Sequence, residues 1–546
     1  MMLKKSLFLM LFSFALNCHA NSNFADLEKL FSQWRAFELA PLHNSAPDYR
    51  QETFAKRRPQ WAEFKAQLLS FDKSDWSTPQ QVDWFVFLAE LNGYDFNERI
   101  LRPWQRDPAF YSQVWTYKSD VPAHEGPTPH YVTELWTYEF PLSDAEQQRL
   151  TQDLSRIKPF HAQGKINLTG NAKELWVAGI RDIKAQHQVL LELAPKLKDT
   201  GNKKLLDTLQ QATESTAEFA QWLEQQSTSK TGPSGLGAEQ YTWYQQHVHL
   251  LPMTWEDEVR LLQRELDRAW SSLKLEEHRN RDLPQQVAAK NAEEYDALAN
   301  RSAAYFLQWL DEKEIVTVAD YFKPALYARL GSFVPEATRN FFYIGSHFDP
   351  TPLYSHFYHW FELAIMENDP NPRAVRTGAL LYNIFDSRNE GTATAVEEIF
   401  MHAGLYDNNP RSREIVYIML AQRAARGLGS LYAHANQMTM EKAGEIHMNY
   451  TPRGWMKTEK ELLIFEQHLY LRQPGYGTSY VTGKALLDHA MAEKARIDEE
   501  QGKAFKLKNF FDELNRIGSV PIAMGTWEMT GIKPAFLDQV EAEARK

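Results

Sequence analysis

Apolar residues recur at steps of three and four positions along most of this chain, and this periodicity restricts the fold class more than any other feature. Thr254 and Asp257 form a capping-box pattern, which Ser143 and Glu146 repeat. After Thr254 the apolar positions that share one helix face are Val259, Leu262, Leu266, Ala269 and Leu273. Further helices are predicted at 55–70, 172–196, 203–226, 294–311, 392–403, 412–436, 458–471 and 480–500.

Alternation with a period of two, the mark of a β-strand, is rare. The best strand candidates are a short pairing of 110–118 with 131–139. The chain has 25 glycines in 546 residues, which is few for the tight turns of a β-sandwich or barrel. We therefore predict a mainly α fold, a single large helical body with two lobes around a cleft and at most a small β-hairpin.

A stretch rich in Gly, Pro and Ser at 227–238 is the clearest internal break. It divides the chain into a predicted N-terminal helical lobe, 21–226, and a second helical lobe, 239–546. The stretch fits a linker between independent domains. It fits equally a functional loop that joins two halves of one body, because glycine lets the backbone approach a ligand closely.

The first residues have the pattern of a secretory signal peptide. Two lysines precede an apolar run at 6–16, and small residues end the segment at Ala20. We expect cleavage of residues 1–20 and a periplasmic mature protein. Lipid attachment at Cys18 is the less favoured alternative, because Asn17 fits poorly before a lipidated cysteine. No later stretch is long and apolar enough for a transmembrane segment.

Charge and cysteine content exclude several classes of function. Lys and Arg number 60 against 71 Asp and Glu, a net charge of −11, and no basic block is present. Such a chain is a poor partner for nucleic acid or an anionic membrane surface. The single cysteine excludes a disulfide framework and a cysteine-based zinc site. A phosphate-binding loop, a G-x-S-x-G elbow and an H-E-x-x-H motif are all missing.

His356, His359 and Glu362 follow one another at three-residue steps. On a helix these positions share a face, and Glu/His pairs at this spacing bind metals in helical bundles. Imidazole and carboxylate donors suit Zn²⁺ or a harder divalent ion. The alternative is a helix crowded with aromatic residues, in which the histidines only pack and donate hydrogen bonds.

Glu390 and Glu397 are seven residues apart, so their directions on a helix differ by about 20°. Neighbouring carboxylates repel unless a cation, a proton or an arginine intervenes, and Arg388 is close enough in sequence to do so. A solvated acidic face is the other interpretation. Further along, Gln473–Tyr480 forms a turn before a helix, whose free N–H groups can bind an anion or a developing oxyanion.

Several short motifs, in matching order over most of the mature chain, resemble the bacterial domain-of-unknown-function 885 family. They are Glu390-Gly391-Thr392-Ala393 followed by Glu397, Arg426 eight residues before His434, Gln473-Pro474-Gly475 with Ser479-Tyr480, and Gly518-Ser519-Val520-Pro521. The resemblance implies a mostly helical zinc metallopeptidase of the gluzincin type. Members of that family carry an H-E-x-x-P-G-H motif and a third carboxylate ligand from E-G-W-A.

This chain departs from the family pattern in its metal motif. Glu390 matches the third carboxylate, although Thr392 replaces the Trp of E-G-W-A. If His359 is the first metal histidine, Trp360 takes the place of the general base, and no Pro-Gly-His follows. The resulting candidate metal ligands are His356, His359 and Glu390. The candidate catalytic residues are Glu362, Glu397, His434 and Tyr480, the last two of which the resemblance places in the cleft.

Two functions follow from these residues. The first is an exported hydrolase of peptides or related amides, with zinc as cofactor and with Glu362 or Glu397 as a replacement base. The alternative is a non-catalytic protein of the same fold that has lost its metal and binds a peptide or a partner protein in an aromatic cleft.

Overall fold

The computed structural model describes residues 23–119, 131–457 and 460–546, and it confirms the prediction of a mainly α fold. The helices of the first half are α1 (Phe24–Glu38), α2 (Gln51–Ser70), α3 (Thr78–Phe96), α4 (Pro103–Arg106), α5 (Asp144–Ser155), α6 (Ile157–Asn167), α7 (Lys173–Leu197), α8 (Lys203–Ser227), α9 (Ala238–His247) and α10 (Trp255–Arg279). They are followed by α11 (Ala292–Glu312), α12 (Phe322–Tyr327), α13 (Phe341–Phe348), α14 (Thr351–His356), α15 (Tyr358–Asn368) and α16 (Asp386–His402). The last are α17 (Ser412–His434), α18 (Met440–Tyr450), α19 (Lys460–Arg472), α20 (Tyr476–Glu500), α21 (Leu507–Ile517), α22 (Ile522–Thr530) and α23 (Phe536–Ala544).

The two helix starts with a capping-box pattern form as predicted. In α10 the Thr254 hydroxyl accepts a hydrogen bond from the backbone N–H of Asp257, whose carboxylate accepts one from the backbone N–H of Thr254. Ser143 and Glu146 cap α5 in the same way. These reciprocal bonds satisfy N–H groups that a helix start otherwise leaves open. The predicted apolar face of α10 is buried at Leu262, Leu266, Ala269 and Leu273.

The strands are very short. β1 (Leu42–His43) and β2 (Ala46–Pro47) form an antiparallel hairpin whose two turn residues, Asn44 and Ser45, both have positive φ angles. Such turns match the twist of a hairpin. β3 (Val114–Trp115) and β4 (Thr133–Glu134) pair where the sequence predicted, but the pairing is parallel. The small hairpin is therefore at 42–47 and not at the predicted pair.

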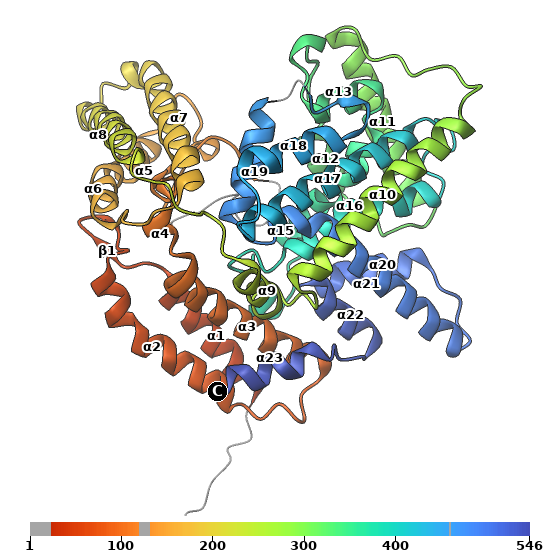
Figure 1. Ribbon diagram of the computed structural model, residues 1–546, viewed down its shortest axis with the longest axis horizontal. Helices are drawn as coiled ribbons and strands as arrows, with labels where there is room; N and C mark the ends of the chain where they lie inside the picture. The colour runs from red at the N-terminus through yellow and green to blue at the C-terminus, as the bar shows by residue number, and fades with distance from the viewer. Residues whose placement is uncertain (1–22, 120–130, 458–459) are drawn as a thin grey trace, which may run out of the picture.

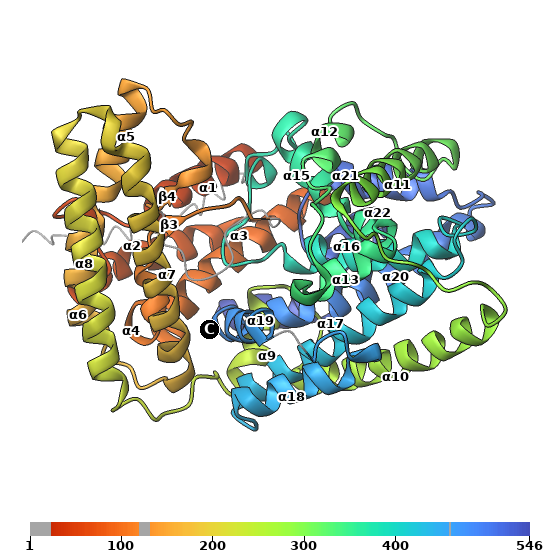
Figure 2. The same ribbon diagram turned by 90° about the horizontal axis from the view of Figure 1, so that it is seen from above.

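Helices α5–α8 stand together as a bundle at one end of the molecule (Figures 1 and 2), with small cores of their own. The main core is larger and joins the beginning of the chain to its end. Phe85 of α3 contacts Trp527 of α22 edge to face, with ring centroids 6.1 Å apart. Lys73 forms an ion pair with Glu541 of α23 at 2.6 Å. The division into lobes at 21–226 and 239–546 stays a prediction.

The segment at 227–238 packs as a loop between α7 and the end of α17. The Lys173 N–H donates to the Gly232 carbonyl at 3.1 Å, and the Gly237 N–H donates to the His434 carbonyl at 2.8 Å. A Cβ atom at Gly235 would lie 2.3 Å from the same carbonyl oxygen. Position 235 therefore requires glycine because the backbone approaches α17 closely. The sequence had suggested close approach to a ligand as a reason for glycine here.

Helices α16 and α20 cross at unusually short distance, because two glycines face each other. A Cβ atom at Gly391 would lie 2.4 Å from the Cα of Gly483, and one at Gly483 would lie 2.2 Å from the Ser387 carbonyl. This crossing places Glu390 beside the first turns of α20. The glycine that follows Glu390 therefore admits the close approach of α20.

Membrane-spanning and export signals are the last features predicted from the sequence. Among the described residues, no helix combines the length and the apolar character that crossing a bilayer requires. The predicted signal peptide at 1–20 and Cys18, the alternative lipid-attachment site, lie outside the described residues.

Candidate metal centre

The structure brings His356, His359 and Glu390, the three predicted metal ligands, into one buried group. Each offers one donor atom, and these atoms lie within 4.8 Å of one another. The side chains come from the end of α14, the start of α15 and the middle of α16. His359 and Glu390 are at most 1% exposed and His356 is 7% exposed. Glu390 therefore faces the interior, and the interpretation of a solvated acidic face is wrong.

The two histidines do not share one helix, contrary to the expectation from their spacing. Helix α14 ends at His356, the chain bends at Phe357, and α15 begins at Tyr358. The bend turns the imidazole rings toward each other, with centroids 5.0 Å apart and planes at 78°. Glu362 continues along α15 and is not part of the donor group.

Glu390 is held by a tyrosine of α20. The Tyr476 hydroxyl donates to Oε1 of Glu390 at 3.0 Å, and Oε2 of the same carboxylate lies 3.7 Å from Nε2 of His356. Because Tyr476 follows Gly475, the glycine of the predicted turn, the turn delivers a hydroxyl to the donor group rather than free helix N–H groups. Gly475 has a φ of +90°, which suits glycine.

Glu397 lies between His356 and an arginine of α17. Oε1 lies 2.9 Å from Nδ1 of His356, and Oε2 accepts from the Arg423 guanidinium at 2.7 Å. Burial raises the pKa of Glu397 to about 7, against the opposing charge of Arg423. Arg388 was the residue predicted to offset the repulsion between the neighbouring carboxylates. Arg423 does so instead, from a helix of predominantly small and apolar residues in which a buried arginine was not foreseen.

His356 is held as a neutral imidazole. Burial, and then the charges of Arg423 and Arg426, place its pKa well below the usual value. Its Nδ1 can donate to Glu397 or accept from Arg423, which lies 3.1 Å away. The first arrangement directs the Nε2 lone pair toward the side on which Glu390 lies, as a metal ligand requires.

Glu362 is not one of the donors and pairs with Arg388, which also donates to the Thr392 hydroxyl at 2.9 Å. Both charged groups are buried. Burial raises the pKa of Glu362 to about 7, and Arg388 opposes this shift. Glu362 and Arg388 line a cavity of about 460 Å³ together with Asp512. The second carboxylate oxygen of Glu362, Oε2, has no hydrogen-bond partner among the described residues.

Tyr480 lies at the donor group, as predicted, and His434 lies elsewhere. The Tyr480 ring stacks on His356 at 6.2 Å with an interplanar angle of 8°, and the Arg426 guanidinium carbon is 4.2 Å from the Tyr480 ring centroid. His434 has other neighbours: its Nε2 is 2.8 Å from the Tyr470 carbonyl and its ring lies 5.2 Å from Tyr241. Burial lowers the pKa of His434 to about 4.

The neighbourhood of Tyr241 supplies a pH prediction. The Tyr241 hydroxyl donates to Glu258 at 3.0 Å, and complete burial raises the pKa of Glu258 from 4.5 to about 7. An acid with a raised pKa stabilises the fold when protonated, so this contribution is present below pH 4.5 and is lost as the pH rises through 7. The parent should lose this contribution between pH 4.5 and pH 8, whereas Glu258→Gln, which cannot ionise there, should not. The difference in unfolding free energy between variant and parent should therefore shift by about 3 kcal/mol in favour of the variant over this range. Urea unfolding at both pH values measures this shift, and a pH-independent difference would contradict it.

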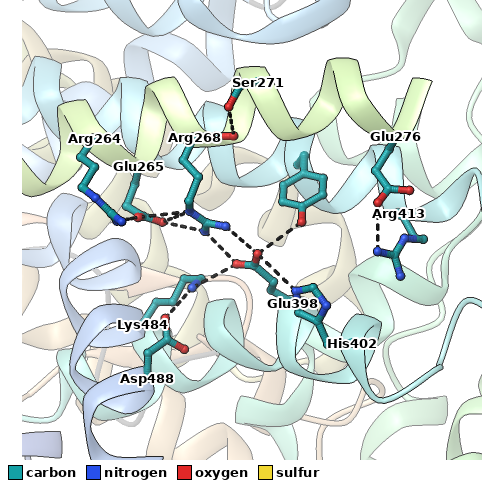
Figure 3. Close-up of polar contacts among 11 residues, drawn as sticks. Arg264, Glu265, Arg268, Ser271, Glu276, Glu398, His402, Arg413, Lys484 and Asp488 are labelled. Atoms are coloured by element: carbon teal, nitrogen blue, oxygen red, sulfur yellow. Dashed lines mark hydrogen bonds and ion pairs between the residues drawn. The ribbon is translucent and has the colours of Figure 1, made fainter. Parts of the chain in front are cut away.

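Glu398, the residue after Glu397, has different partners and connects three helices, α10, α16 and α20 (Figure 3). It accepts two hydrogen bonds from Arg268 of α10, at 2.6 and 2.8 Å, and lies 3.1 Å from Lys484 of α20. Lys484 also pairs with Asp488 at 2.7 Å. These ion pairs hold α16, the helix that carries Glu390 and Glu397, between α10 and α20.

Comparison with known proteins identifies the fold and nothing finer. No family model matches the chain, and no curated protein matches it. A solved structure of a candidate lipoprotein of unknown function from Shewanella oneidensis aligns with a TM-score of 0.66 at 15% identity, over 93% of this chain and 99% of the other. A candidate lipoprotein from Colwellia psychrerythraea aligns with a TM-score of 0.64 at 13% identity, over 94% and 98%. The fold is shared along almost the whole chain.

Proposed function

We propose that this protein is an exported zinc-dependent hydrolase of peptides or related amides, with a metal site altered from that of the domain-of-unknown-function 885 family. The observation that carries the proposal is the convergence of His356, His359 and Glu390 from three helices. Export rests on the predicted signal peptide. The descriptions of the two similar structures as candidate lipoproteins agree with it.

The donor set fits a zinc ion. Two imidazoles and one carboxylate are ligands that Zn²⁺ prefers, and three protein ligands leave a position for water. Arg423 and Arg426 bring positive charge nearby, but each is paired with a carboxylate, Glu397 and Glu466, at 2.7 Å. The ion would supply Lewis acidity and lower the pKa of a bound water.

The surrounding side chains have distinct tasks under this proposal. Glu397 orients His356 through Nδ1, and Tyr476 orients Glu390. Of the two predicted bases, Glu362 is the better candidate, because one of its oxygens has no partner among the described residues and a pKa of about 7 suits proton transfer near neutrality. Tyr480 is the candidate hydrogen-bond donor to the oxygen of a tetrahedral intermediate.

A specific observation favours the second function, a non-catalytic binding protein. The three donors are almost inaccessible, and the cavities of about 390 and 460 Å³ are lined by other residues. Both functions share the fold, and they differ in whether a metal is bound and a bond is cut.

Elemental analysis of protein purified without a metal-affinity tag separates the two functions. The hydrolase requires about one zinc per chain and cleavage of members of a peptide library, with loss of cleavage after chelation. Zinc without cleavage would reject the hydrolase and keep the metal site. Absence of both, including after incubation with added zinc, would leave the binding protein.

Glu397→Gln tests the orienting role within the same proposal. The variant keeps the size of the side chain but weakens its attraction for the Nδ1 proton of His356, so we expect zinc affinity to fall by about 10- to 100-fold. Competition with a chromophoric chelator measures this affinity. Glu398→Gln is the matched control, because the adjacent carboxylate contacts Arg268 and not a donor. Equal zinc affinity of the parent and Glu397→Gln would reject the orienting role.

A further inference from the structure

We infer that a cavity of about 390 Å³, between the N-terminal helices and the turn before α20, binds an uncharged amide that carries an aromatic side chain. Such a group is a residue within a peptide or an acylated amino-acid amide. The inference deepens the proposed function by naming a substrate class. It rests on that function for the fate of the ligand, whereas binding in this cavity needs no metal.

One wall of the cavity is aromatic. Phe54 stacks on Trp104 with centroids 4.1 Å apart, and Tyr49 meets Phe110 edge to face at 4.7 Å. Aromatic walls of this kind bury large apolar area and hold a ring or a branched side chain. Small-molecule sites typically combine such a wall with a few polar groups that fix orientation.

The polar groups of the cavity match an amide. Besides Arg472, three uncharged lining residues carry an atom without a hydrogen-bond partner among the described residues: the Tyr94 hydroxyl, Nε2 of Gln473 and Oδ1 of Asn97. The first two can donate to a carbonyl, and the third can accept from an N–H, so together they complement both halves of an amide. Tyr94 and Gln473 are more than nine-tenths buried. Neighbouring atoms cover these polar atoms, so a ligand reaches them through rotation of side chains in the wall.

The charges of the cavity disfavour an anionic ligand. Arg472, which lines it, is paired with Asp107 at 2.9 Å and Asp182 at 2.6 Å. The other charged lining residues are three acids, Glu38, Asp48 and Glu134, and one base, Arg57. A free carboxylate would therefore meet net negative charge, and a neutral amide would not.

Two residues in the wall of the cavity have positive φ angles. Tyr382 and Asn383 both have a φ of +57°, which asparagine adopts readily but which is costly for tyrosine, and such strain is found at ligand-binding segments. The Tyr244 hydroxyl holds this segment by donating to the Tyr382 carbonyl at 3.0 Å. The Asn383 amide donates to Oε1 of Gln473. The strained segment leads directly into α16, which carries Glu390.

The test measures binding of N-acetyl-L-phenylalaninamide to the metal-free mature chain by titration calorimetry and ligand-observed NMR. N-acetyl-L-alaninamide lacks the ring, 3-phenylpropionate replaces the amide with a carboxylate, and phenethylamine replaces it with an ammonium group. We expect N-acetyl-L-alaninamide to bind at least tenfold more weakly and 3-phenylpropionate not to bind measurably. Phenethylamine should bind more weakly than the amide, because it offers no carbonyl oxygen to the donors of Tyr94 and Gln473.

Two variants and a control complete the design. Tyr94→Phe removes only the unpartnered hydroxyl and should weaken binding by about 3- to 10-fold. Gln473→Glu keeps the oxygen that accepts from Asn383 and replaces the N–H donor with an oxygen, so binding should be lost. Tyr305→Phe removes a hydroxyl outside the cavity, one that donates to Leu405 at 2.9 Å, and should change nothing.

Three results would overturn the inference: absence of binding at the solubility limit, equal binding of a comparison ligand, or unchanged affinity in both variants. Because the chain is metal-free, these results are independent of zinc content. If the protein binds zinc but no amide, the proposed ligand of the cavity is wrong and the metal site stands. If it binds the amide but cannot bind zinc, the proposed metal site is wrong and the cavity's ligand stands.

Discussion

His359→Ala should purify without stoichiometric zinc. His359 supplies one of three donors, and removing a ligand from a site of this size is expected to cost about 3 kcal/mol or more, which corresponds to a roughly 100-fold loss of affinity. The same loss should abolish metal-dependent hydrolysis. Elemental analysis and chelator competition measure the change.

The control for this variant is His402→Ala, on the same helix as Glu390. The His402 side chain is 63% exposed and reaches only Glu398, at 3.7 Å, so its loss should leave zinc content unchanged. Because His359 is buried, its replacement by alanine also leaves a void, and His359→Gln separates the two effects by keeping much of the volume. Full zinc occupancy in both His359 variants would remove this residue from the site.

Arg376→Met should lower the free energy of unfolding by about 3–5 kcal/mol. The Arg376 side chain is fully buried and joins the two ends of the chain. It pairs with Asp83 of α3 at 2.6 Å and with Glu528 of α22, and it donates to the Ile517 carbonyl at 2.9 Å. Methionine fills similar space but leaves two buried carboxylates without their main partner.

Arg373→Met is the matched control, because Arg373 meets the same two carboxylates at 3.4 and 3.7 Å while its side chain is 22% exposed. Its loss should cost about 1 kcal/mol or less. Urea unfolding followed by tryptophan fluorescence compares the two variants. Equal losses would show that burial of Arg376 contributes nothing beyond the ordinary effect of a surface pair.

Local signals in the sequence predicted most of the helices. The capping boxes at Thr254 and Ser143, and the apolar stripe of α10, are decided by neighbours within a few residues, and the structure confirms them. Helix α16 was predicted to begin six residues too late. Its residues are buried on all sides, so the contrast between an apolar and a polar face that marks a helix start is missing.

The sequence predicted the residues of the candidate site better than it predicted their hydrogen-bond and ion-pair partners. Spacing indicated His356 and His359, and the family resemblance indicated Glu390, all of which the structure brings together. Partners that come from other helices could not be foreseen. Arg388 pairs with Glu362 rather than with Glu390 or Glu397, and Arg423 fills the expected role, because pairing depends on which helix faces cross.

The contact of α3 with α22 has a consequence for biogenesis. Translation proceeds from the N-terminus, so Phe85 and its neighbours are made long before Trp527, the ring against which Phe85 packs. A ribosome-bound or prematurely terminated chain therefore exposes this apolar surface until its final helices have been synthesised.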